Sequence, residues 1–214
     1  MTGCAFDLAH YGEILDAARA GGHRFAFFDH EPEQGDLFLR HDVDMSLDAA
    51  LVFAELEAER GVAATYFLMT RSDFYNLDSR PGERALARLR ELGHRVGLHG
   101  VHPHAALDDR FDPVLAWHTP EPEYMSEPVD GVVNVMRPPW FDPANYRSDS
   151  NQHWRSGCPH DDLREARFEW LQLLVHPEIW VFDGATMRET MESLIAAERD
   201  VMLRKMGENR IDLA

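Results

Sequence analysis

The strongest constraint on the fold is an alternation of apolar and amphipathic segments in the first hundred residues. Residues 62–69 (VAATYFLM) form a continuous apolar run, which is typical of a strand buried on both faces of a parallel sheet. The flanking sequence predicts further strands at 24–28, 36–41 and 94–99. Strands that alternate with helices indicate an α/β sheet or barrel.

Helices are expected where apolar residues recur with helical spacing between a capping residue and a glycine. They cover residues 7–20, the segment from Ser46 to Gly61, residues 82–92 and residues 186–206. The last is long and amphipathic. We find no internal repeat and no low-complexity linker, so residues 1–214 are expected to form a single domain.

Residues 100–165 differ from the rest of the chain because prolines and aromatic residues are frequent there and periodicity fades. Strands are expected at 114–118 and 131–136, with long loops around them, and a buried strand follows at 170–175. Long loops in α/β folds often carry functional residues, so this region is expected to contribute to a site.

Composition excludes several classes of function. The net charge of -17 repels phosphate backbones, so nucleic acid is not expected as a partner. No apolar stretch approaches the length of a membrane-spanning helix, and the first residues do not resemble a secretory signal, which predicts a cytoplasmic protein. Cys4 and Cys158 are far apart in sequence and do not indicate a disulfide framework. The 12 histidines are the unusual feature.

Two aspartates end the strand expected at 36–41. Asp42 and Asp44 point to the same face of an extended chain, and two such carboxylates repel each other unless a cation lies between them. A metal ion or an arginine would serve. The alternative is that Asp44 stabilises the start of the helix capped by Ser46, which leaves Asp42 unexplained.

Three histidines follow the strand expected at 94–99. His99, His102 and His104 lie within six residues, and neutral imidazoles suit zinc, iron, cobalt or nickel. His99 and His102 share a face if the chain turns helical, whereas His102 and His104 share one if it stays extended. The alternative is a solvated loop that is rich in histidine.

Two later segments are ambiguous when taken alone. Arg137 precedes Pro138-Pro139-Trp140, and its guanidinium could hold a carboxylate in a bidentate grip or lie at the surface. His176 follows the apolar strand at 170–175 and could be either a functional residue or a core histidine. The aspartates and histidines earlier in the sequence make a functional role for both residues the favoured interpretation.

The order of these segments resembles the polysaccharide deacetylases of carbohydrate esterase family four, which share the NodB-homology domain. The chain is most similar to a divergent branch with a first motif RHDVD (40–44) and a last motif LLxHP (173–177). The similarity runs from about Leu39 to Trp180. It implies a distorted (β/α)7 barrel.

The resemblance also implies a metal site. The matching positions are Asp42 as catalytic base, Asp44 as metal ligand and His99 as the first histidine ligand. The family's second histidine follows four residues later, where this chain has a proline. His102 is our choice for that ligand, with His104 as the alternative.

The remaining family motifs imply the rest of the machinery. Arg137 matches the arginine that orients the base, and His176 matches the histidine acid. The family pairs an aspartate with a tryptophan, and Asp149 with Trp154 loosely resembles that pair. Asp149 would then hold the other nitrogen of His176. Trp140 and His118 are candidate substrate contacts.

Together these positions predict a metal-dependent hydrolase, an N-deacetylase of an N-acetylated sugar or sugar precursor. The resemblance implies one divalent metal ion, with zinc as first choice and iron, cobalt, nickel or manganese as alternatives. A cytoplasmic location favours a nucleotide-linked or lipid-linked precursor as substrate. The alternatives are a metal-binding relative without turnover, a hydrolase of a non-sugar carbon–nitrogen bond, and a plain scaffold domain.

Overall fold

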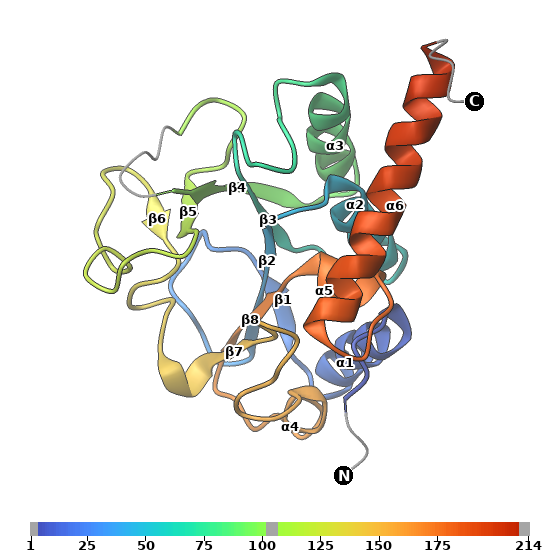
Figure 1. Cartoon of the computed structure of the whole chain (residues 1–214). Coiled ribbons are helices and arrows are strands. Elements are labelled where there is room, and N and C mark those ends of the chain that lie inside the picture. The colour runs from blue at the N-terminus through green and yellow to red at the C-terminus, as the bar shows by residue number, and fades with distance from the viewer. Residues whose placement is uncertain (1–3, 102–106, 210–214) are drawn as a thin grey trace.

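The computed structural model describes residues 4–101 and 107–209 and is built on a curled sheet of eight parallel strands (Figure 1). The strands are β1 (Arg24–Ala26), β2 (Asp36–Val43), β3 (Thr65–Leu68), β4 (Arg95–Gly100), β5 (Val114–Trp117), β6 (Val133–Asn134), β7 (Tyr146–Ser148) and β8 (Leu171–Val175). Seven follow the order β6-β5-β4-β3-β2-β8-β7. The result is a mixed α/β protein with a parallel half-barrel, which is compatible with the expected distorted barrel.

The long strand β2 organises the sheet. It pairs with β8 along one edge over residues 37–41. Its other edge is shared, because β1 pairs with residues 36–38 and β3 pairs with residues 40–43. The carboxyl-terminal half of β2 therefore lies between β3 and β8, with its last residues at the edge where parallel strands end.

Most helices lie on one side of the curled sheet, and the long connections between residues 107 and 145 lie on the other (Figure 1). The helices are α1 (Leu8–Ala20), α2 (Leu47–Glu59), α3 (Arg80–Glu91), α4 (His160–Arg164), α5 (Pro177–Val181) and α6 (Met187–Glu208), with a 3-10 turn η1 at Pro143–Asn145. The four expected helices are confirmed. The short elements α4, α5, η1 and β7 were not expected, because three to five residues are too few to show a period.

Side chains alternate between two cores along the strands, as period-two geometry requires. Leu37 and Leu39 on β2 face the helices, whereas Phe38 belongs to a smaller cluster inside the half-barrel. Gly97 on β4 is needed for this inner packing, because a Cβ there would lie 2.6 Å from the ring of Phe67. The inner face is thus closely packed below the carboxyl ends of the strands.

A buried carboxylate joins the sheet to the helices. Glu57 on α2 accepts hydrogen bonds from the hydroxyls of Tyr66, at 2.6 Å, and of Tyr11. It also pairs with His41 Nε2 at 2.7 Å. His41 therefore points to the helical side of β2, away from its neighbours Arg40 and Asp42, and serves the core. Within the described ranges, no helix is long and apolar enough to cross a membrane.

Candidate metal and acid-base site

Polar side chains from five different strands meet at the carboxyl edge of the half-barrel. Asp44 follows β2, His99 lies near the end of β4, His118 follows β5, Asp149 follows β7 and His176 follows β8. In parallel α/β folds the connections at this edge carry the functional residues. The topology therefore assembles the group from residues that are far apart in the sequence.

Three of these side chains converge on one point. Asp44 Oδ1 lies 3.1 Å from His99 Nε2 and 3.2 Å from His118 Nδ1. The two ring nitrogens are 3.1 Å apart. Donor atoms that bind one ion at about 2.1 Å lie about 3.0–3.4 Å from each other at octahedral to tetrahedral angles. These three residues are close enough to hold a metal ion.

The hydrogen bonds around this group fit a cation. His99 Nδ1 lies 3.0 Å from the carbonyl oxygen of Ala116 and donates to it, so Nε2 carries the lone pair that faces Asp44. Asp44 Oδ1 is buried, yet no donor in the described part of the chain forms a well-aligned hydrogen bond with it. Buried carboxylate oxygens are normally partnered, and a bound metal ion would satisfy this one.

Electrostatics keep Asp44 ionised. Burial opposes ionisation, but contact with the imidazoles of His118 and His99 outweighs it and holds the pKa of Asp44 well below its usual range. Contact with Asp44 in turn raises the pKa of His118. The site therefore presents a carboxylate and two imidazoles, the oxygen and nitrogen donors that zinc and similar divalent ions accept.

Asp42 is held by Arg40, which is two residues earlier on the same face of β2. Arg40 Nε donates to Asp42 Oδ1 at 2.8 Å, and Nη2 donates to Oδ2 at 2.6 Å. Burial alone would raise the pKa of Asp42, but the Arg40 guanidinium keeps it below the usual range. Gln172 on β8 accepts from Arg40 Nη1 at 3.2 Å and fixes the arginine in place.

His176 is oriented by a buried aspartate, Asp149. Its Nδ1 lies 2.6 Å from Asp149 Oδ1, and its backbone N–H donates to Oδ2 at 2.9 Å. The indole N–H of Trp180 also donates to Asp149 Oδ2, at 2.7 Å. Burial would lower the pKa of His176, but Asp149 outweighs it and raises the pKa to about 10. His176 Nε2 lies 4.0 Å from Asp44 Oδ2.

Two hollows adjoin Asp44. One, of about 200 Å3, is lined by residues that include His176, Ser150 and Glu178. The other, of about 440 Å3, is lined by residues that include His118 and Phe74. A ligand that reached Asp44 could therefore extend to either side of it, toward His176 or toward the exposed Phe74 ring.

Glu178 is an unusual wall of the smaller hollow. It is 1 % exposed, and neither carboxylate oxygen has a hydrogen-bond partner among the residues described. Burial raises its pKa to about 8, so the side chain is protonated at neutral pH. A neutral carboxylic acid thus lies two residues after His176, in the hollow that also reaches Asp44.

Several sequence predictions take a different form in the structure. The arginine that holds Asp42 is Arg40, and no described contact joins Arg137 to Asp42. The tryptophan that holds Asp149 is Trp180, whereas the indole N–H of Trp154 donates to Cys4 Sγ at 3.2 Å.

The two candidate substrate contacts, Trp140 and His118, lie in different surroundings. The Trp140 indole donates to the carbonyl oxygen of His30 at 2.9 Å, and its ring packs against the inner core. His118, by contrast, joins Asp44 and His99 in the possible metal group. His102 and His104 lie outside the described residues.

Arg40 and His118, whose roles in the site were not predicted, are only weakly marked in the sequence. Arg40 and Asp42 are spaced i and i+2 on a predicted strand, which places them on one face, and this spacing could have identified the pair. His118 follows an expected strand as His99 does, but a single histidine beside a proline-rich loop is not distinctive.

Comparisons of the chain with family models, with curated proteins and with solved structures gave no match. The family resemblance therefore stays a prediction from the motifs. The geometry by itself supports a more general description, in which a possible metal group lies between an arginine-bound carboxylate and an aspartate-bound histidine.

Proposed function

We propose that the protein is a metal-dependent hydrolase with a NodB-type barrel that removes the acetyl group from an N-acetylated sugar or sugar precursor. The proposal joins the motif resemblance to the arrangement of polar groups at the carboxyl edge of the sheet. Its central observation is that Asp44 has two imidazole nitrogens near one oxygen and His176 Nε2 4.0 Å from the other.

Asp44, His99 and His118 would hold the divalent cation, with zinc as first choice. Such an ion, when bound, polarises an acyl carbonyl and makes a water molecule more acidic. The three side chains are pre-positioned for this role, because His99 is fixed by Ala116 and both nitrogens already face Asp44 Oδ1. His118 would then take the role that the family motif gives to a second histidine after His99, the role predicted for His102 or His104.

Asp42 would act as the base. Its Oδ2 lies 3.7 Å from His99 Nε2, so the carboxylate is adjacent to the group that would hold the ion. Arg40 keeps Asp42 ionised and fixes its orientation, and each carboxylate oxygen retains a second lone pair that can accept a proton. Arg40 is therefore a positioning residue in this proposal.

His176 would act as the acid. An amide nitrogen leaves readily only when it is protonated, so hydrolysis of an N-acetyl group requires a proton donor near the leaving atom. Asp149 anchors Nδ1, and the raised pKa of about 10 means that Nε2 carries a proton at neutral pH. The acid and the base thus approach Asp44 from β8 and β2.

One observation favours a second candidate, a sugar-binding relative without turnover. Arg40 occupies both oxygens of Asp42, and an ion pair of this strength makes the carboxylate a weaker base. In that case the metal group would serve recognition alone.

The test is a substrate panel with metal-loaded protein. We expect acetate release from an N-acetylated sugar, with little from small aliphatic acetamides, and we expect chelation to abolish it. The Asp42→Asn variant should lose the activity, and the His153→Gln variant should keep it, because His153 is exposed and outside the site. Metal binding without any release would support the non-catalytic candidate, and equal release from simple amides would exclude sugar specificity.

A further inference from the structure

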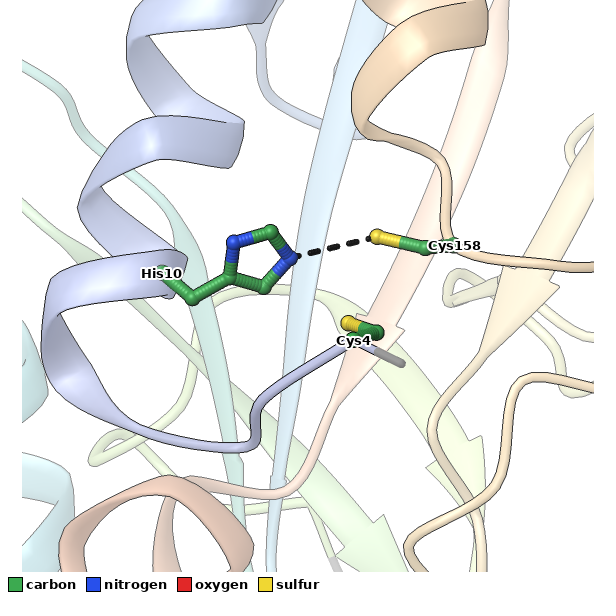
Figure 2. A group of neighbouring side chains, drawn as sticks. All are labelled: Cys4, His10 and Cys158. Atoms are coloured by element: carbon green, nitrogen blue, oxygen red, sulfur yellow. Dashed lines mark hydrogen bonds between the residues drawn. The ribbon is translucent and has the colours of Figure 1, made fainter. Parts of the chain in front are cut away.

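A second group of metal-type ligands lies apart from the Asp44 group. Cys4 precedes α1, His10 lies in the first turn of α1, and Cys158 lies just before α4. Figure 2 shows the two sulfur atoms and the imidazole of His10 pointing toward one another. Their ligand atoms all lie within 4.8 Å of each other, although Cys4 and Cys158 are separated by most of the chain.

The imidazole of His10 is turned so that one nitrogen faces the sulfur atoms. His10 Nε2 lies 3.3 Å from Cys158 Sγ, as the dashed line in Figure 2 marks. His10 Nδ1 lies 2.9 Å from Glu13 Oε2 and donates to that carboxylate. A histidine that ligates a metal commonly donates its other N–H to a carboxylate in this way.

Cys4 is also prepared by a fixed donor. The indole N–H of Trp154 donates to Cys4 Sγ at 3.2 Å and fixes the position of that sulfur atom. Both cysteines are half-buried and free of disulfide bonds in the structure. Two sulfur atoms and one imidazole nitrogen are soft to borderline donors, a set that suits zinc and discriminates against magnesium and calcium.

We propose that Cys4, His10 and Cys158 bind a zinc-type divalent cation at a second, structural site. His160 lines the same hollow, and its Nδ1 lies 2.9 Å from Asp161 Oδ1, the same pattern of ring nitrogen and carboxylate as in His10. The site shares no ligand with the Asp44 group, because its ligands belong to the amino-terminal segment, α1 and the loop before α4.

A cation at this position would hold together segments that are far apart in the sequence. It would join the residues before α1 to the loop before α4. The His10 ring also stacks on Trp180, at 6.3 Å between centroids, and the Trp180 indole donates to Asp149. The proposed cation site therefore stabilises the support of His176 as well as the amino-terminal segment.

Cobalt substitution in the full-length protein tests this site directly. Cobalt bound to thiolates gives an intense sulfur-to-metal charge-transfer band, and the Asp44 group contains no sulfur that could produce one. We expect cobalt, added up to the two equivalents that both proposed groups would bind, to generate the band in the purified, reduced protein. The band should persist in Asp44→Asn, so a failure of the proposed function would not affect this result.

Three variants separate the ligands from their surroundings. Cys158→Ser should abolish the band, and His10→Gln, which keeps both thiols, should weaken cobalt binding by about tenfold or more. His153→Gln serves as the matched control, because His153 is an exposed histidine five positions from Cys158, and it should leave the band unchanged. Measured in the Asp44→Asn background, which removes the other metal group, chelation should lower the Tm with or without His153→Gln but not when Cys158→Ser is present.

Two results would overturn the proposal. The first is the absence of a thiolate band while titration shows both thiols free and reduced in the native protein. The second is a native protein in which both thiols are missing from the titration, return only after reduction and leave cobalt unbound. That result would identify the pair as a disulfide. If Cys158→Ser does not fold, the His10→Gln affinity and the wild-type band still decide the question.

Discussion

Arg40 and Asp42 form a bidentate ion pair within a single strand, with distances of 2.8 and 2.6 Å between paired atoms. Both side chains are almost fully buried, and Arg40 also lies over the ring of Phe67. An ion pair in such surroundings repays its desolvation only when its geometry is good and its remaining hydrogen bonds are made. Gln172 makes one of them, so the pair is integrated into the inner face of the half-barrel.

Loss of Arg40 should therefore destabilise the protein strongly. Arg40→Gln leaves the Asp42 carboxylate buried without its cation, and removal of one partner of a buried pair typically costs about 3–5 kcal/mol. Urea denaturation measures this cost. Arg137→Gln is the matched control, expected to change the free energy of unfolding by less than about 0.5 kcal/mol because its side chain is half-exposed.

The double variant Arg40→Gln with Asp42→Asn refines this prediction. It removes both charges and should recover part of the lost stability. A larger loss of unfolding free energy in Arg137→Gln than in Arg40→Gln would show that Arg137 holds Asp42, as the motif resemblance implies.

His118 should bind metal as strongly as His99 does. Both ring nitrogens lie within 3.2 Å of Asp44 Oδ1, so each should be needed for tight binding. We expect His118→Gln and His99→Gln each to reduce metal content well below that of the His153→Gln control. Elemental analysis after dialysis measures the content. Full retention in His118→Gln, with loss in a variant of His102 or His104, would identify that histidine as the second ligand instead.

His176→Gln should separate the chemistry from the fold. The backbone N–H of residue 176 still donates to Asp149 in this variant, but the buried carboxylate loses its charged partner, so the melting temperature should fall whatever the role of His176, and the comparison of two substrates carries the test. If His176 is the acid, amide turnover falls by roughly 10²–10⁴-fold. Turnover of an ester with a phenolate leaving group falls less, because that group departs without a proton. Equal losses on both substrates would identify a core histidine instead.

Glu178 should make the metal-free protein less stable as pH rises. Its pKa is about 8 in the folded protein against a usual 4.5, so between these values the unfolded chain has lost a proton that the folded protein keeps. The free energy of unfolding is therefore unaffected by Glu178 below about pH 4.5, where the side chain is protonated in both states, and decreases as the pH rises toward 8.

Glu178→Gln imitates the protonated acid and should stabilise the metal-free protein, by on the order of 1–3 kcal/mol at pH 7 and much less at pH 5. Thermal melts of both proteins at the two pH values measure the difference. The same change in Tm at both would show that Glu178 does not titrate in this range.

Much of the fold follows from local sequence. The apolar run at 62–69 and the shorter runs around it predict strands that the structure contains, because burial on both faces of a parallel strand leaves a readable pattern. The rule that sites gather at the carboxyl ends of parallel strands places Asp44, His99 and His176 at one edge, and the structure brings them there. Both the strands and the residues at their ends could be predicted because each depends on residues that are adjacent in the sequence.

The partners of those residues were decided only by the tertiary structure. Arg40 rather than Arg137 meets Asp42, Trp180 rather than Trp154 meets Asp149, and His118 joins Asp44.

Cys4 and Cys158 come together although the sequence alone indicated no relation between them. A sequence shows which side chains can bind each other, but the curl of the sheet and the docking of α1 against α4 set which ones come into contact. The physical cause of these contacts is the packing of distant segments, which local periodicity does not encode.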